Sequence, residues 1–76
     1  AGRSYDFILA NINRNILLAD MPAYAAALTP GGDLVMSGFL EQDVPAITGA
    51  AAKLGLKPVA VETRDGWMLV HVKKVS

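Results

Sequence analysis

Two apolar stretches without a helical period predict buried β-strands. The first covers residues 7–12 and reaches a polar amide at Asn11. The second covers residues 33–39 and ends on Ser37, Gly38 and Phe39. Neither stretch alternates between apolar and polar residues, which is typical of strands that are covered on both faces, as in parallel sheets. We therefore expect two parallel strands buried on both faces.

Two segments show apolar residues at helical spacing, one after each of these strands. The first set is Leu17, Met21, Tyr24 and Leu28, and the second is Val44, Ile47, Ala51 and Leu54. Pro22 either kinks the first helix or lies in the first turn of a helix capped by Asp20; we favour a short turn from Asn15 and a helix from about Met21. Residues 29–32 end this helix, and Gly55 ends the second.

The last third of the chain predicts an antiparallel hairpin. Residues 56–63 are rich in β-branched side chains, Arg64-Asp65-Gly66 is a turn signal, and residues 67–72 form the returning strand. The order strand, helix, strand, helix, hairpin predicts one α/β domain with a mixed four-stranded sheet, in which crossover helices join the two parallel strands. Ligands bind such sheets at the carboxyl ends of the parallel strands, here residues 11–13 and 37–39.

Composition narrows the possible partners. Of the 76 residues, 53% are hydrophobic and 18% are charged, a composition that indicates part of a larger core. Seven basic and seven acidic residues are scattered along the chain, which argues against nucleic acid or an anionic membrane as partner. The lack of cysteine excludes thiolate zinc sites and agrees with a cytoplasmic location. Ala1 to Ser4 are expected to be a remnant of cloning or processing.

Two motifs carry a resemblance to class I S-adenosylmethionine-dependent methyltransferases. The segment Leu28-Thr29-Pro30-Gly31-Gly32-Asp33-Leu34 is similar to their Leu-x-Pro-Gly-Gly-x-Leu turn. Residues 5–12 and 34–40 resemble the strand ends Asp-x-(aliphatic)₂-x-Ala-Asn-Ile and aliphatic-Ser-Gly-aliphatic-Leu of the family that methylates large-subunit ribosomal protein eleven. The resemblance runs from about Tyr5 to Lys74 and implies the C-terminal half of a Rossmann-like catalytic domain.

One departure from the superfamily pattern is as informative as the matches. The sequence has no Gly-x-Gly-x-Gly loop after a first strand and no acidic residue after a second strand, the two features that hold the methyl donor. Gly31-Gly32 follows a helix, so it cannot replace that loop. The resemblance therefore implies that the donor-binding half and the substrate-recognition domain lie outside this chain. We expect the chain alone to methylate nothing.

The resemblance also implies the chemistry, which is methyl transfer from S-adenosylmethionine to an amino group of a ribosomal protein. A lysine amine titrates near ~10.4 and must lose its proton before it can attack. The amide oxygen of Asn11 can accept a hydrogen bond from this amine without holding it as an ammonium. The family implies that Asn11 lies beside the reacting methyl group, as catalytic and donor-binding residue, with the backbone at Ile12 helping to bind the donor. If the resemblance is set aside, the sequence favours a structural role for Asn11, as a loop or helix-capping residue.

Three residues are candidates for contact with the substrate: Asn13, Ser37 and Gly38. Asn13 also fits a loop or helix-cap position, as does Asn15. Ser37 has no histidine or acid spaced to activate it, so we expect a small pocket residue rather than a nucleophile.

The remaining polar and aromatic candidates are given structural roles. His71 has no second histidine and lies on a strand expected inside the sheet, so no metal site is predicted. Trp67 opens the last strand and is expected to pack far from the carboxyl ends of the parallel strands. Lys73 and Lys74 are expected to form a solvated end.

Two other functions compete with the methyltransferase hypothesis. A small interaction module would self-associate through the exposed edge of the first strand. Half of a nucleotide-dependent dehydrogenase would share the alternating strands and helices, but the terminal hairpin and the Pro-Gly-Gly turn count against it.

Overall fold

The computed structural model describes residues 4–75, so three residues of the expected remnant, Ala1 to Arg3, lie outside the described part. The predicted order of elements is confirmed. Along the chain the elements are β1 (Tyr5–Asn11), α1 (Arg14–Ala27), β2 (Leu28–Phe39), the 3₁₀ turn η1 (Glu41–Asp43), α2 (Val44–Lys53), β3 (Leu56–Arg64) and β4 (Trp67–Lys74).

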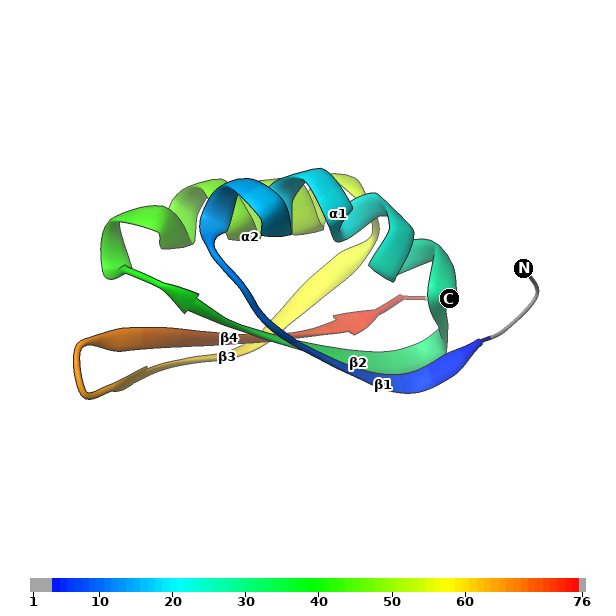
Figure 1. The fold of residues 1–76 in the computed structure, drawn as a ribbon. Helices are drawn as coiled ribbons and strands as arrows, with labels where there is room; N and C mark the ends of the chain where they lie inside the picture. Colours follow the sequence, from blue (N-terminus) through cyan, green and yellow to red (C-terminus); the bar gives the residue numbers. More distant parts are fainter. Residues whose placement is uncertain (1–3, 76) are drawn as a thin grey trace.

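The four strands form one mixed sheet in the order β1-β2-β4-β3 (Figure 1). β1 and β2 pair in parallel, while β4 is antiparallel to both β2 and β3. The last strand of the chain therefore lies between β2 and β3, which confirms that His71 is on an interior strand. The mixed sheet predicted from the sequence is also confirmed.

Both helices lie on the same face of the sheet, and the core fills the space between them (Figure 1). The core residues that are fully buried alternate along β2 and β4 and recur at helical spacing in α1 and α2: Leu17, Met21, Leu34, Met36, Ile47, Ala51, Val70 and Val72. The opposite face of the sheet is open in the described residues. Phe7 and Leu9 of β1 are 57% and 63% exposed, so the expectation that the first strand is buried on both faces is wrong for this chain.

Helix α1 begins earlier than the sequence pattern suggested. Asn13 is its N-cap, and the Asn13 Oδ1 accepts a hydrogen bond from the Ile16 N–H at 3.0 Å. Pro22 lies inside the helix on an exposed position, so water can bind the backbone carbonyl that proline leaves without a donor. The expected start near Met21, with Asp20 as the cap, is therefore wrong. The cap at Asn13 and the burial of Leu17 and Met21 in the core together offset the proline penalty.

The connection from α1 to β2 is irregular, as the proline and glycines predicted. Leu28 pairs with Tyr5, but the next pair is Asp33 with Phe7, so residues 29–32 form a bulge against β1. Gly31 has φ of +82°, a conformation that favours glycine. The helix ends at Ala27, one residue before the expected end at Leu28, and β2 starts at Leu28 rather than at the predicted residue 33.

The two lysines near the C-terminal end are not simply solvated, which corrects the expectation from the sequence. Lys74 is half-buried, and its Nζ donates hydrogen bonds to the carbonyl oxygens of Ala25 at 2.7 Å and Leu28 at 3.0 Å. A lysine at the C-terminal end of a helix satisfies carbonyls that have no partner within the helix. Lys74 thus ties β4 to the end of α1.

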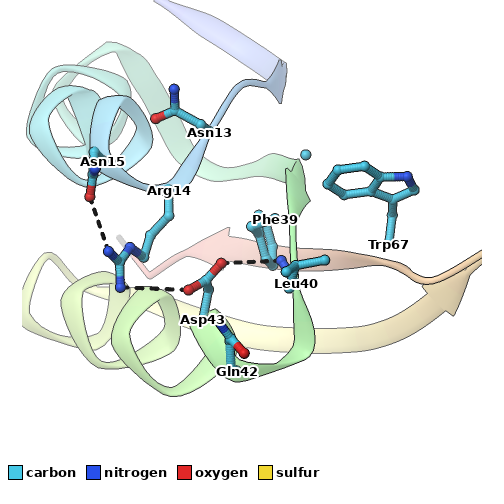
Figure 2. A pocket seen from close by; sticks show the side chains of 9 residues that line it. Asn13, Arg14, Asn15, Phe39, Leu40, Gln42, Asp43 and Trp67 are labelled. Carbon is cyan, nitrogen blue, oxygen red and sulfur yellow. Dashed lines mark hydrogen bonds and ion pairs between the residues drawn. The ribbon is translucent and has the colours of Figure 1, made fainter.

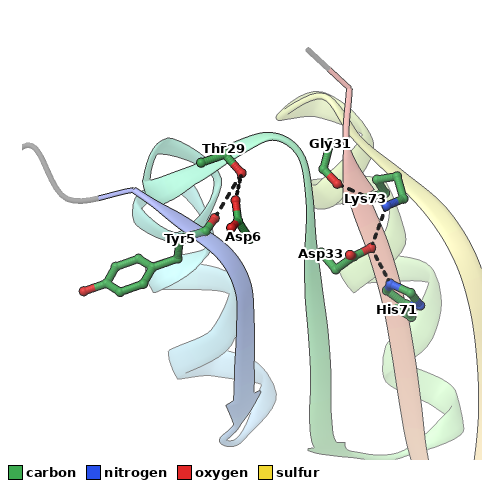
Figure 3. A network of polar contacts seen from close by, with 7 residues as sticks. All are labelled: Tyr5, Asp6, Thr29, Gly31, Asp33, His71 and Lys73. Carbon is green, nitrogen blue, oxygen red and sulfur yellow. Dashed lines mark hydrogen bonds and ion pairs between the residues drawn. The ribbon is translucent and has the colours of Figure 1, made fainter.

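A polar cluster joins β2 and β4 on the open face of the sheet (Figure 3). Asp33 Oδ1 lies 2.8 Å from His71 Nε2 and 3.0 Å from Lys73 Nζ, and the same lysine donates to the Gly31 carbonyl oxygen at 3.1 Å. The hydrogen bond from His71 and then that from Lys73 hold the pKa of the Asp33 carboxyl below its ordinary value of 3.8. Asp33 is therefore ionised at neutral pH.

This shift gives Asp33 a pH-dependent part in stability. Because its folded pKa is lower than its unfolded pKa, its contribution is complete above pH 3.8 and is lost as pH falls through the folded pKa. We expect Asp33→Asn to be less stable than the parent at neutral pH, with the difference shrinking in acid. Urea denaturation across pH 2 to 7 measures this, with the exposed Asp20→Asn as control. A difference that stays constant with pH would contradict the assignment.

Candidate functional site

The carboxyl ends of the two parallel strands bring the predicted site residues to one edge of the sheet. Asn11 pairs with Ser37 in the β1–β2 register. The pairing continues one residue further, because the Ile12 N–H donates to the Ser37 carbonyl oxygen at 3.2 Å. Asn11, Ile12, Asn13, Ser37 and Gly38 therefore lie together, as the sequence predicted. Their roles in catalysis and binding stay predictions.

Gly38 is the residue that allows Asn11 to approach β2. It is the extra residue in a bulge of β2 against β4, and its φ is +94°. A Cβ at this position would lie 2.8 Å from Asn11 Oδ1 and 2.9 Å from the Ile12 carbonyl oxygen. Both contacts are too short for any side chain, so Gly38 is required for the packing of the Asn11 amide and of the end of β1.

Trp67 lies at this site, which corrects the expectation that it packs far away. β4 runs antiparallel to β2, and Met68 pairs with Phe39, so β4 begins where β2 ends. Trp67 is 54% exposed. It borders a pocket of about 460 Å³ together with the side chains or backbone of Asn11, Ser37, Gly38, Arg64 and Asp65. The hairpin signal in the sequence places Trp67 at the start of β4, and the pairing of β4 with β2 brings that start to the carboxyl end of β2.

A second pocket of about 370 Å³ shares Gly38 and Trp67 with the first (Figure 2). Asp43, at the end of η1, lines this pocket and contacts two of its other residues. One carboxylate oxygen lies 3.5 Å from Arg14 Nη1, and the other accepts from the Leu40 N–H at 3.2 Å. The sequence analysis did not single out Arg14 or Asp43, because the pair joins two segments that are far apart in the chain. The ion pair joins the first turn of α1 to η1.

The chemical groups at the site are mostly neutral. Asn11 contributes an amide and Ser37 a hydroxyl, while Arg64 and Asp65 bring charges that cancel. Within residues 4–75 the Ser37 hydroxyl has no histidine or carboxylate within hydrogen-bond distance, which fits a pocket residue rather than a nucleophile. No cluster of metal-ligating side chains occurs in the described part. None of its helices is long and apolar enough to cross a membrane.

Replacing Gly38 tests the packing of Asn11. We expect Gly38→Ala to lower the free energy of unfolding by about 1–3 kcal/mol, because the new Cβ strains the backbone and collides with Asn11. Urea denaturation measures the loss, and the amide signals of Asn11 and Ile12 should shift. Gly49→Ala is the matched control: Gly49 lies in α2 with open space around it, so alanine should stabilise the helix by up to ~1 kcal/mol. Equal effects at the two positions would contradict the packing argument.

The N-cap of α1 can be tested in the same way. Asn13→Ala removes the acceptor for the Ile16 N–H and should cost about 1 kcal/mol of stability. Asn15→Ala is the control, since the Asn15 side chain accepts only an exposed contact from Arg14. The expectation fails if the two asparagines prove equally tolerant in denaturation experiments.

Comparison with known proteins agrees with this arrangement. A family model described as ribosomal protein L11 methyltransferase matches residues 1–75. The curated protein of that name from Phocaeicola vulgatus is 48% identical over 68 residues, which cover 90% of this chain and 24% of the relative. The corresponding protein from Porphyromonas gingivalis is 49% identical over 63 residues, 83% of this chain and 22% of the relative.

Solved structures show the same fold. The crystal structure of ribosomal protein L11 methylase from Lactobacillus delbrueckii subsp. bulgaricus superposes with a TM-score of 0.89 at 24% identity, covering 100% of this chain and 40% of that chain. A methyltransferase from Pyrococcus furiosus gives a TM-score of 0.77 at 17% identity, covering 100% and 44%. The fold is that of part of a Rossmann-like methyltransferase domain.

The chain spans about a quarter of the length of the curated relatives it matches. Its strand ends, its sheet order and the family match over nearly all of its residues agree with one another. This chain belongs to the ribosomal protein L11 methyltransferase family.

Proposed function

We propose that this chain is the acceptor side of the active site of a longer enzyme, which transfers methyl groups from S-adenosylmethionine to amino groups of ribosomal protein L11. The observation that carries the proposal is the position of the Asn11 amide. It stands at the carboxyl end of β1, packed against Gly38 and bordering the pocket next to Trp67. The names of the relatives supply the substrate.

The chain supplies only part of a binding site for the methyl donor. Asn11 and the backbone at Ile12 offer neutral oxygen acceptors, which suit a cationic sulfonium. S-adenosylmethionine, when bound, supplies an electrophilic methyl group. The glycine-rich loop and the acidic residue that hold the rest of this molecule are absent from the sequence. We therefore propose that the chain alone is inactive and that donor binding needs the remainder of the longer protein.

The proposed role of Asn11 is to orient the amine that is to be methylated. An amine attacks through its lone pair, so it must be deprotonated before the reaction. An amide oxygen accepts an N–H hydrogen bond and has no net charge, so it favours the ammonium less than a carboxylate would. Arg64 and Asp65 carry opposite charges, and together they add no net charge at the pocket. Holding the amine in the direction of attack supplies a large part of the rate.

We propose that the other predicted site residues shape the pockets and contact the substrate. Asn13 and Ser37 line the two pockets and would contact the substrate, while Gly38 leaves room for it between Asn11 and Trp67. We propose the cytoplasm as the location of the longer enzyme, because its proposed substrate is a ribosomal protein. We expect neither nucleic acid nor membrane as a direct partner, since the charges cancel over the chain.

Asn11 is tested in the longer polypeptide that contains this chain, with S-adenosylmethionine and ribosomal protein L11 as substrates. We expect Asn11→Ala to lower kcat by on the order of 100-fold, because the amine loses its orienting acceptor. Asn11→Asp should also lower kcat and should shift the pH–rate profile upward, because a carboxylate holds the ammonium form. The measurement is transfer of a labelled methyl group.

Two controls make the result specific. Asp20→Ala changes an exposed residue of α1 and should leave kcat unchanged. The chain by itself should give only background transfer. If Asn11→Ala retains parental kcat, the catalytic role of Asn11 is refuted, and if the chain alone transfers methyl groups, the proposed division of the site is wrong.

The competing hypotheses are weaker. The family match favours a methyltransferase over half of a dehydrogenase. The free edge of β1, with Phe7 and Leu9 exposed, is the observation that favours an interaction module. In a family whose members are about four times as long, this edge is better explained as a contact with the rest of the polypeptide.

A further inference from the structure

The turn between β3 and β4 has a sequence and a backbone geometry that allow a reaction within the chain itself. Asp65 and Gly66 are the two central residues of this turn, and Arg64 pairs with Trp67 across it. The φ angles of Asp65 and Gly66 are +48° and +85°. Positive φ at both central residues defines a type I′ turn. The sequence contains no other aspartate that is followed directly by glycine.

The two groups that would react in this turn are free of competing contacts. Asp65 and Gly66 are exposed at the tip of the hairpin (Figure 1). Within residues 4–75 the Asp65 carboxylate makes no hydrogen bond and no ion pair, and the Gly66 N–H has no backbone acceptor. Apart from its chain neighbours, no atom lies within 4 Å of the place that a Cβ of residue 66 would take. The carboxyl group and the amide nitrogen can therefore approach each other.

We infer that Asp65 isomerises to isoaspartate in the folded protein, through a cyclic imide with Gly66, and that this change alters the pocket bordered by Asn11. In the first step the Gly66 nitrogen attacks Asp65 Cγ. The N–Cγ bond forms, the Cγ–OH bond of the protonated carboxyl group breaks, and the amide proton leaves with this hydroxyl as water. Water then adds to one of the two imide carbonyls. Opening at Cγ restores aspartate, whereas opening at the main-chain carbonyl carbon gives isoaspartate, in which the chain runs through Cβ and Cγ.

The turn can reach the geometry of ring closure without losing its strand pairing. A planar five-membered ring places the Gly66 nitrogen in line with Asp65 Cβ, which for an L-residue requires a ψ of about −120°, the value of the first central residue in a type II′ turn. Types I′ and II′ both fit a two-residue hairpin, and a rotation of the peptide unit between the central residues interconverts them. This rotation reverses the sign of φ at Gly66, which glycine tolerates.

The product fits the hairpin less well than aspartate does. Isoaspartate adds one carbon atom to the backbone of a loop whose length sets the register of the two strands. Arg64, Asp65 and Trp67 all border the pocket that Asn11 also borders. The longer loop therefore shifts Trp67 relative to Asn11. This effect on activity rests on the proposed function, whereas the isomerisation itself does not.

Peptide mapping tests the isomerisation in the longer polypeptide that contains this chain, kept folded at neutral pH and physiological temperature. The endoproteinase that cleaves before aspartate does not cleave before isoaspartate, so mass spectrometry of the resistant peptide measures the yield with time. We expect Asp65 to isomerise at least roughly tenfold faster than Asp20, which is also exposed but precedes Met21 inside α1, where the helix must open first. Equal rates at the two positions would overturn the inference.

Two substitutions test whether the folded turn permits ring closure. Asp65→Asn keeps the type I′ preference and closes the same imide with loss of ammonia in place of water. It should react faster than the parent and give both aspartate and isoaspartate. Asp65→Gly also keeps the turn but has no carboxyl group, so it should give no resistant peptide. If the folded Asp65→Asn protein retains its amide while the urea-unfolded protein loses it, the turn blocks ring closure and the inference is wrong.

The effect on the pocket is measured as transfer of a labelled methyl group by aged samples. The kcat of the parent should fall in proportion to its isoaspartate content, whereas Asp65→Gly should keep its own initial kcat. An unchanged kcat in a parental sample that has mostly isomerised, or equal losses in the two proteins, would refute the effect on the pocket. If the longer polypeptide transfers no methyl groups before ageing, the proposed function fails, and peptide mapping still decides whether Asp65 isomerises.

Discussion

The parallel pairing of β1 with β2 is the constraint on which the rest of this structure depends. It places Asn11 opposite Ser37, and the residues just before them, Ala10 and Met36, point to the helix face and are buried in the core. Side chains alternate along a strand, so a slip of one residue would exchange the two faces and send the Asn11 amide into the core. The packing of Ala10 and Met36 therefore fixes the position of a polar residue that lies outside the core. Stability and the geometry of the site rest on the same register.

Gly38 shows how the edge of the sheet is adapted once the register is set. A Cβ at position 38 would collide with the Asn11 amide, and glycine, which has no Cβ, also adopts the positive φ of the bulge that bends β2 here. The bend also brings Phe39 into the core, where it is fully buried, and places Met68 opposite it. Trp67 follows from this pairing as the next residue outward. One bulge thus links the candidate catalytic amide, the aromatic wall of the pocket and the end of the core.

Much of this could be predicted from the sequence, because strand runs, helical spacing and turn residues are local signals. The order of elements and the gathering of Asn11, Ser37 and Gly38 needed nothing else. Trp67 was misplaced because its position depends on β4 pairing with β2, a contact between distant segments. The start of α1 was misjudged because the proline at position 22 was weighed against propensity, and not against the cap at Asn13 together with the burial of Leu17 in the core. Lys74 was read as solvated because its partners, the carbonyl oxygens of Ala25 in α1 and of Leu28 just after it, are 49 and 46 residues away.

The expectation of strands buried on both faces failed for an informative reason. An apolar run without alternation is selected by the environment of the whole protein, and the 76 residues here are about a quarter of the length of their relatives. The pattern of β1 is therefore explained best by a second layer that this chain does not contain. By the same reasoning, the exposure of Leu9 is explained by the missing layer, because an apolar side chain at this position is removed from water only when that layer is present. The residues of the open face therefore reflect an environment that this chain lacks, and Asn11 lies on that same face, at the carboxyl end of β1.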